Sequence, residues 1–292
     1  MIDIYVPTYK RKTFRILELL KDKNIRLNLC VRRSEIENNF YEHLYNNPQI
    51  NFVDLGNNIC DIGDTRERII CFCQAHNIKY CIMLDDTVSD IYYKDSNYIT
   101  DVSSSACLKM CIEQMKENEE MNVMFALSTE QRKHHAQDIN TKYFLHCPAQ
   151  GFIINTELCK QHNINFHSLK IVGSEDMAFF IDTLKAGLLT CTNRHINMTV
   201  ETTLKQKSGG THTDKYSVER KSDIYTSNLR KYVGNMYGVY FTKRYRHQIE
   251  SQCCFTAFDY EYFIDVLIKY RDENKQIIDS QFKVKEDDYD EI

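Results

Sequence analysis

Two pairs of adjacent carboxylates in this sequence stand where side chains can take part in chemistry. Asp85 and Asp86 directly follow the apolar run 80–84, whose length and composition are typical of a buried strand. These carboxylates must be solvated, paired with a cation or bound to a metal. Glu175 and Asp176 precede an apolar pattern with helical spacing, and a carboxylate fixed there could act as a general base for a hydroxyl group. Both pairs also have ordinary explanations, as a polar turn and as acids at a helix amino terminus.

The segments around these residues alternate between strand and helix patterns. The strand patterns lie at 2–6, 27–31, 50–53, 80–84, 122–127 and 151–155. The helix patterns lie at 14–20, 64–73, 103–115 and 174–187. Strands separated by helices indicate βαβ units, and open α/β sheets bind ligands at the carboxyl ends of their strands. We therefore expect a single α/β domain with Asp85 and Asp86 at such an edge.

Two of the predicted helix starts bear on the candidate site. Asp64 is expected to cap one helix, with Glu67 completing a capping box. Arg66 in the first turn would oppose the helix dipole unless an anion or an acid lies nearby, so contact with a phosphate is one explanation for it. Ser174 is expected to cap the other helix and Gly187 to end it.

The C-terminal third differs in charge from the rest of the chain. Residues 205–246 contain ten Lys or Arg against three Asp or Glu, with tyrosines interleaved, whereas the whole chain has a net charge of −4. Basic and aromatic side chains mixed in this way suit a polyanion with exposed bases, although a solvated basic face is the alternative. The glycine-containing loop 208–213 could close over a ligand. The candidate nucleic-acid contacts are Arg220, Lys221, Arg230, Lys231, Lys243, Arg244 and Arg246.

Composition limits the class of protein. The chain has 292 residues, of which 42% are apolar, and no apolar stretch approaches the roughly 18 residues of a membrane span. Its twelve cysteines lie inside predicted strands and helices without a preceding signal peptide, so we expect reduced thiols and a cytoplasmic location. The paired His134 and His135 lie in a polar loop, where solvated side chains are the simpler explanation than a metal site.

Four short segments, taken together and in order, resemble the landmarks of GT-A glycosyltransferases. They are Val6-Pro7-Thr8-Tyr9-Lys10-Arg11, Gly63-Asp64-Thr65-Arg66, Leu84-Asp85-Asp86-Thr87 and Gly173-Ser174-Glu175-Asp176. More narrowly, the combination is similar to the TET/JBP-associated glycosyltransferases, which include the base J glucosyltransferase and phage enzymes that glycosylate hydroxymethylated DNA bases. The resemblance covers roughly residues 1–200. It implies an α/β fold with a GT-A-like, Rossmann-type mixed sheet flanked by helices, followed by a mostly helical C-terminal extension.

The resemblance also implies a role for each matching position. Binding of the nucleotide sugar would fall to Pro7, Thr8, Arg11, Asp64, Arg66, Asp85 and Lys215. Asp85 and Asp86 match the beginning of the family's Asp-x-Asp motif, so they would hold Mg²⁺ or Mn²⁺ together with His212. The third position of that motif is Thr87, which leaves the motif incomplete. Asp176 matches the catalytic base of inverting members, with Glu175 beside it.

We therefore interpret the sequence as an inverting hexosyltransferase, with UDP-glucose as the favoured donor and a hydroxymethylated pyrimidine of DNA as acceptor. The expected parts are a catalytic core over 1–204, a basic extension over 205–284 for lid and acceptor binding, and an acidic tail over 285–292. One alternative is a polysaccharide, lipid or protein acceptor, and another is a non-catalytic nucleic-acid-binding relative. A sugar-nucleotide pyrophosphorylase normally has a glycine-rich basic loop, which residues 8–12 lack. The oligomeric state is not indicated.

Overall fold

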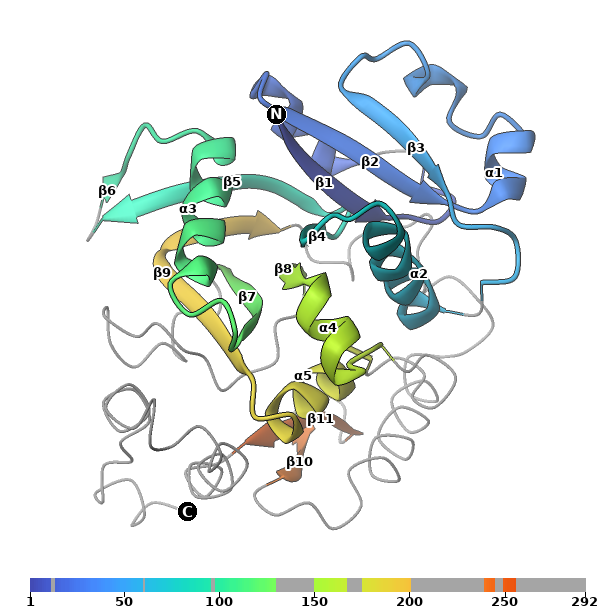
Figure 1. Ribbon diagram of the computed structural model, residues 1–292. Coiled ribbons are helices and arrows are strands. Elements are labelled where there is room, and N and C mark those ends of the chain that lie inside the picture. Colours follow the sequence, from blue (N-terminus) through green and yellow to red (C-terminus); the bar gives the residue numbers. More distant parts are fainter. Residues whose placement is uncertain are drawn as a thin grey trace, which may run out of the picture.

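The chain forms a mixed α/β fold built around one long sheet, as the computed structural model shows (Figure 1). The structure describes residues 1–11, 14–59, 61–95, 98–129, 150–166, 175–200, 239–244 and 249–255. Its helices are η1 (Arg15–Lys21), α1 (Arg33–Glu37), η2 (Glu42–Leu44), α2 (Ile62–Ala75), α3 (Ser104–Lys116), α4 (Thr156–His162) and α5 (Glu175–Lys185), where η marks a 3-10 helix. Its strands are β1 (Ile2–Pro7), β2 (Ile25–Val31), β3 (Ile50–Asp54), β4 (Tyr80–Leu84), β5 (Val88–Asp95), β6 (Tyr98–Ile99), β7 (Asn122–Thr129), β8 (Gly151–Asn155), β9 (Leu189–Val200), β10 (Val239–Arg244) and β11 (Ile249–Phe255).

The sheet has nine described strands in the order β3-β2-β1-β4-β8-β7-β9-β5-β6. Strands β3, β2, β1 and β4 run parallel, with Ile4 of β1 opposite Leu27 of β2 and Ile82 of β4. Strand β8 runs antiparallel to both β4 and β7, which makes the sheet mixed. Because β1 and β4 are parallel neighbours, the loops that follow them emerge side by side at one edge of the sheet.

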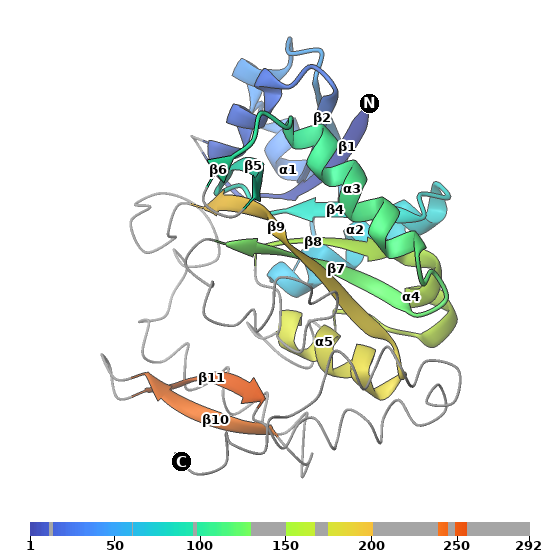
Figure 2. The ribbon, with the colours of Figure 1, turned by 90° about the vertical axis from the view of Figure 1, so that its left-hand side faces the viewer.

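Each face of the sheet is covered by its own hydrophobic core, because successive apolar side chains of β1 point to opposite faces. Ile4 and Val6 belong to the core shared with η1 and α3. The intervening Tyr5 belongs to the core on the other face, shared with α2, α4 and α5. Figure 2 shows α3 and α5 on opposite sides of the sheet. The sheet is therefore the middle layer of the fold and fixes the positions of both strand-end loops.

Several local predictions are confirmed by the described residues. The apolar run 80–84 is β4, an interior strand in which every residue after Tyr80 is buried. The helix predicted at 103–115 is α3, and its N-cap Ser103 accepts a hydrogen bond from the Ala106 amide. Gly187 has a φ of +71°, the left-handed conformation that suits a glycine after a helix end.

Other parts of the fold were not expected from the sequence. Strand β5 begins at Val88, two residues after Asp86, and is antiparallel to the twelve-residue strand β9. In the C-terminal third, the described residues form an antiparallel strand pair, β10 and β11. The predicted final helix around Tyr260 and the tail 285–292 lie outside the described residues. Among the helices that the structure describes, none is both long enough and apolar enough to cross a membrane.

Candidate active site

The loop after β1 and the loop after β4 meet through Asp86. The Asp86 carboxylate accepts hydrogen bonds from the Thr8 hydroxyl at 3.2 Å and from Arg11 Nε at 2.9 Å. All three residues are buried, with exposed fractions of 8% or less. Burial raises the pKa of Asp86, while Arg11 and Thr8 counteract that rise by favouring the ionised carboxylate. Asp86 therefore links the loop after β1 to the loop after β4.

Asp85 is the more accessible carboxylate of the pair. Its side chain is 25% exposed, against 9% for Asp86. Its backbone amide donates to the Gln150 carbonyl oxygen at 2.9 Å, which anchors the turn to the residue preceding β8. The pKa of Asp85 is raised to about 6, first because desolvation disfavours its charge, and also because Asp86 and Asp176 are close enough to repel it. Asp85 therefore sits where a cation would relieve unfavourable negative charge.

Arg66 on α2 joins the end of β4 to the start of α5. Its Nη2 lies 3.1 Å from Asp85 Oδ1, and its Nη1 lies 2.7 Å from Glu175 Oε1. Only 3% of Arg66 is exposed, and its guanidinium lies over the ring of Phe152 at 5.2 Å from the centroid. Burial alone would lower the pKa of Arg66, but the carboxylates of Asp85, Glu175 and Asp176 raise it. The arginine thus remains charged and is held by two carboxylates.

The two acids of α5 occupy different environments. Both lie in the first turn, where the helix dipole favours negative charge. Glu175 is 5% exposed, and its pKa is raised to about 7 because burial disfavours its charge and Asp176 repels it, while Arg66 acts in the opposite sense. Asp176 is half-buried. Glu175 is therefore held in the interior by its ion pair with Arg66, whereas Asp176 is partly exposed to solvent.

Comparison with known proteins identifies the family. The family model described as TET-Associated Glycosyltransferase matches residues 2–210, which is most of the chain. The chain belongs to this family and is a glycosyltransferase. No curated protein matches it significantly.

Solved structures similar to this glycosyltransferase have low sequence identity to it. Residues 1–349 of TarS from S. aureus, in complex with UDP, align with a TM-score of 0.44 at 13% identity, covering 98% of this chain and 76% of that one. A197 from STIV aligns with a TM-score of 0.40 at 12% identity, covering 68% and 85%. A cytidylyltransferase from Leptospira borgpetersenii aligns with a TM-score of 0.40 at 9% identity, covering 97% and 98%. Likenesses at this level do not bear on function.

The start of α2 differs from the sequence prediction. The N-cap is Asp61, whose carboxylate accepts from the Asp64 amide at 2.9 Å, and the helix begins at Ile62. The prediction of Asp64 as the cap is wrong because Asp61, three residues earlier, satisfies the free amide there. The Asp64 carboxylate instead pairs with Arg68, one turn further along the helix. Arg66 consequently lies in the second turn, and its two ion pairs account for its presence.

Part of the predicted site lies outside the described residues. This applies to His134, His135, Ser174, His212, Lys215, Arg220, Lys221, Arg230, Lys231 and Arg246. Lys243 and Arg244 lie in β10, for which the structure describes the backbone strand alone. The proposed roles of these residues remain predictions. The structure brings together Thr8, Arg11, Arg66, Asp85, Asp86 and Glu175, with Asp176 adjacent.

A buried carboxylate beside the first loop was not predicted from the sequence. Glu35 of α1 is 4% exposed and accepts the Lys10 amide at 2.7 Å. Its only sequence signal is its position three residues after Arg32, where the third residue of a helix often completes a capping box. The connection between α1 and the loop after β1 depends on tertiary packing and has no local pattern.

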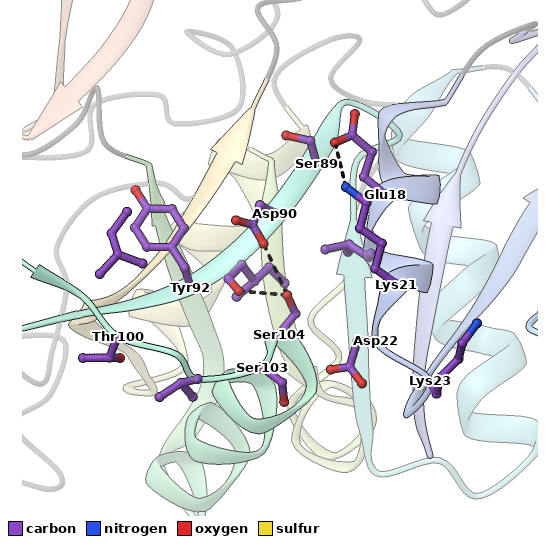
Figure 3. Close-up of a pocket in the computed structure, with 14 residues that line it drawn as sticks. Glu18, Lys21, Asp22, Lys23, Ser89, Asp90, Tyr92, Thr100, Ser103 and Ser104 are labelled. Atoms are coloured by element: carbon purple, nitrogen blue, oxygen red, sulfur yellow. Dashed lines mark hydrogen bonds and ion pairs between the residues drawn. The ribbon is translucent and has the colours of Figure 1, made fainter.

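A cavity of about 620 Å³ lies between η1, β5 and the start of α3 (Figure 3). Polar groups in its lining are bonded to neighbouring parts of the protein. The Ser104 hydroxyl donates to the Ile91 carbonyl oxygen at 2.8 Å and lies 3.5 Å from Asp90. The Asp22 carboxylate accepts the Ser105 amide at 2.9 Å. No residue of the sequence-predicted site lines this cavity, so we place the candidate active site at the ends of β1 and β4.

The site carries more negative than positive charge. The four carboxyl groups Asp85, Asp86, Glu175 and Asp176 are accompanied by the guanidinium groups of Arg11 and Arg66. Carboxylate oxygens are the ligands that Mg²⁺ and Mn²⁺ prefer, and Mg²⁺ is commonly held by one or two carboxylates plus substrate phosphates. Within the described residues no three His, Cys, Asp or Glu side chains are grouped as a metal site. Asp85 and Asp86 therefore provide carboxylate ligands of the kind that these cations prefer.

Proposed function

We propose that this glycosyltransferase transfers a hexose, with inversion, from UDP-glucose to a hydroxymethylated pyrimidine base in DNA. The observation that carries the proposal is the Arg66 bridge. It joins a strand end that bears one accessible carboxylate, Asp85, to a helix start that bears another, Asp176. Transfer from a nucleotide sugar needs a cationic site for the departing diphosphate and a base on the opposite side of the sugar. Two accessible carboxylates on elements fixed to each other support both requirements.

The donor diphosphate would lie at the carboxyl ends of β1 and β4. Pro7 ends β1, and the buried contacts from Thr8 and Arg11 to Asp86 hold the following loop against β4. Asp85 would face the donor, because it is the more exposed of the two carboxylates. Arg66 would orient Asp85 toward the donor, since its terminal nitrogens contact Asp85 and Glu175.

A divalent cation fits this arrangement. Asp85 would hold Mg²⁺ or Mn²⁺ together with the donor phosphates, and His212 is a further candidate ligand from the predicted loop. When bound, the cation would neutralise negative charge that develops on the departing diphosphate. Asp86 contributes less directly, because one of its oxygens is bound by Thr8 and Arg11. The absence of a third carboxylate at Thr87 is compatible with a cation whose remaining ligands are phosphate and water.

In the transfer step, Asp176 would accept the proton of the acceptor hydroxyl group. The acceptor oxygen forms a bond to the anomeric carbon while the bond from that carbon to the diphosphate oxygen breaks. The electron pair of the broken bond leaves with the nucleoside diphosphate, and the configuration at the anomeric carbon inverts. Glu175 keeps the start of α5 in place through Arg66, and its raised pKa, about 7, follows from that buried position.

The DNA acceptor is supported by the basic segment 205–246 and by the family's association with hydroxymethylated bases. Ten Lys or Arg in that segment suit a phosphate backbone, and the interleaved tyrosines suit an unstacked base. We infer that residues 1–204 form the catalytic core and that 205–284 supply the lid and the acceptor contacts. A base must leave the duplex to enter a deep site, which such a segment would favour.

The decisive experiment is a transfer assay read by mass spectrometry. The enzyme is incubated with a panel of nucleotide sugars and with DNA that contains 5-hydroxymethylcytosine or 5-hydroxymethyluracil, with Mn²⁺ or with EDTA. The expected result is a hexose mass gain on hydroxymethylated DNA with UDP-glucose, lost in EDTA. Unmodified DNA of the same sequence is the control. A mass gain on a glycan, lipid or protein instead would support the alternative acceptor class, and DNA binding without any transfer would support a non-catalytic relative.

A further inference from the structure

Glu35 is a buried carboxylate whose hydrogen bonds are made to two adjacent loops and to the core. Its Oε1 accepts the Lys10 amide and the Tyr41 hydroxyl, each at 2.7 Å, and its Oε2 accepts the Arg32 amide at 3.0 Å. Only 4% of Glu35 is exposed. A buried carboxylate is tolerated when donors surround it, so these three bonds define one orientation of the side chain.

Tyr41 ties this carboxylate to the hydrophobic core. The Tyr41 ring is fully buried and packs against Phe14, Phe40 and Phe52, with centroids 4.9–6.0 Å apart. Burial and the Glu35 carboxylate raise the pKa of the Tyr41 hydroxyl, so it remains a proton donor. Tyr41, held in an aromatic cluster, thus fixes one side of the Glu35 carboxylate. The carboxylate also accepts the backbone amides of Lys10 and Arg32 from the two loops.

The Lys10 amide belongs to an uncommon backbone conformation. Lys10 has a φ of +50°, a left-handed value that non-glycine residues adopt rarely because Cβ crowds the following carbonyl. The next residue, Arg11, turns back to contact Asp86 through Nε at 2.9 Å. The hydrogen bond that the Lys10 amide donates to Glu35 is therefore placed where the loop needs an external support.

A second contact joins the same two loops. The Arg32 guanidinium lies over the ring of Tyr9, with its central carbon 4.0 Å from the centroid. The backbone amide of Arg32 donates to Glu35 at the same time. The loop after β1 and the turn after β2 are therefore joined by two contacts, one through the Glu35 carboxylate and one between Arg32 and Tyr9. Both contacts lie at the end of the sheet that carries the candidate donor site.

We propose that Glu35 is a positioning residue of the donor site, which fixes the Lys10 bend and thereby directs Arg11 onto Asp86. This inference rests on the proposed function, because the Arg11 contact matters for transfer only if a nucleotide sugar binds beside Asp85. Glu35 itself does not touch the donor. It preorganises the loop, so its loss weakens donor binding by allowing the loop to adopt other conformations.

The test compares Glu35→Gln with Glu37→Gln, the same chemical change at an exposed position on the same short helix. Hydrogen exchange by mass spectrometry reports the mobility of residues 8–11, and isothermal titration with UDP and Mn²⁺ reports donor-site affinity. We expect Glu35→Gln to speed exchange in residues 8–11 and to weaken UDP binding about tenfold, the scale of one hydrogen bond to a charged group. Glu37→Gln should change neither quantity, and thermal melting confirms that both variants are folded.

A rescue variant separates this role from general stability. Lys10→Gly, combined with Glu35→Gln, should restore most of the UDP affinity, because glycine adopts positive φ without a steric penalty. Unchanged exchange in Glu35→Gln, or rescue that fails while the protein remains folded, would overturn the positioning role. If the unaltered enzyme does not bind UDP, the proposed function fails. The hydrogen-exchange rates of residues 8–11 in the two variants still decide whether Glu35 fixes the loop.

Discussion

Arg66 and Glu175 form a buried ion pair between α2 and the first turn of α5, with Nη1 of the arginine 2.7 Å from Oε1 of the glutamate. The residues are 109 positions apart in the chain. The same guanidinium reaches Asp85 at 3.1 Å, so the start of α5 is held in register with the end of β4. This relationship fixes the accessible Asp176 relative to the proposed donor site.

Replacing Arg66 by methionine should destabilise the protein strongly. The substitution leaves Glu175 and Asp85 without their cation, and removing one partner from a buried ion pair typically costs about 3–5 kcal/mol. Methionine retains much of the packing volume against Phe152 and Phe166, so the loss would be mainly electrostatic. Urea unfolding at pH 7 measures the change in the free energy of unfolding.

The matched control is Arg33→Met, which makes the same change in an exposed ion pair. Arg33 contacts Asp54 at 2.8 Å, but the arginine side chain is 59% exposed. Exposed pairs contribute up to about 1 kcal/mol, so this variant should remain close to the unaltered protein. Equal losses in the two variants would mean that burial of the Arg66 pair has no special importance for stability.

Asp176→Asn should abolish transfer while leaving the donor site intact. An amide cannot accept the proton of the acceptor hydroxyl, and general base catalysis typically contributes about 10²–10⁴-fold in rate. Because Asp176 is half-buried in the first turn of α5, the substitution should preserve the helix. The turnover rate at saturating donor and the affinity for UDP are the two measurements.

Asp182→Asn provides the comparison for this prediction, because Asp182 is a partly buried aspartate further along the same helix. It should retain the rate of the unaltered enzyme within about threefold, as expected for a group outside the reaction. Full activity in Asp176→Asn would exclude this residue as the base. Activity lost together with UDP binding would instead point to a structural role.

Much of the catalytic core could be predicted because its signals are local. The apolar run before Asp85 and the i, i+3, i+4 pattern after Asp176 each follow from one segment of chain. The partners of Arg66 could not be predicted in this way, since Asp85 and Glu175 come from distant segments and only packing brings them together. The sequence indicated that Arg66 needs an anion or an acid nearby, with a phosphate as one explanation, and the structure supplies two carboxylates.

The true start of α2 illustrates a second limit of sequence reasoning. Asp61 and Asp64 are both suitable N-cap residues at neighbouring positions, and local propensity does not distinguish them. The structure selects Asp61, while Asp64 pairs with Arg68. The role of Glu35 could not be predicted from local sequence, because the Lys10 amide that it binds lies 25 residues away on a neighbouring loop.

Asp22 should contribute stability that disappears at low pH. Partial burial would raise its pKa, but hydrogen bonds from Ser105 and Asn24 outweigh this effect, and the pKa is lowered from 3.8. The ionised carboxylate therefore stabilises the fold above about pH 4, and this contribution is lost as the pH falls through the folded-state pKa. Asp22→Ala should lose about 1 kcal/mol at pH 7, as for a helix cap, and less at pH 3.

Urea unfolding of both proteins at pH 7 and pH 3 tests this dependence on pH. Asp101→Ala is the control, because Asp101 is exposed just before α3 and should cost little at either pH. A deficit for Asp22→Ala that is as large at pH 3 as at pH 7 would mean that packing, rather than the ionised carboxylate, accounts for the effect.

Gly151→Ala should overpack the centre of the sheet beside the candidate site. A Cβ at Gly151 would lie 2.7 Å from Met198 Sδ and 2.9 Å from Leu84 Cδ2, closer than side chains tolerate. Both atoms are ends of flexible side chains, so the protein should still fold with a loss of about 1–3 kcal/mol. Leu84 immediately precedes Asp85, and Gly151 follows the Gln150 carbonyl that binds the Asp85 amide.

A double-mutant cycle with Met198→Val identifies the source of this loss. Valine removes the sulfur atom that the new methyl group would meet, so the double variant should be more stable than the sum of the two single effects, by about 0.5–3 kcal/mol. Urea unfolding of the four proteins gives this coupling energy. Strictly additive effects would show that the contact with Met198 is not the source of the loss, which would then come from the contact with Leu84 or from a shift of β8. A shift of β8 would also displace the Asp85 turn and reduce UDP affinity.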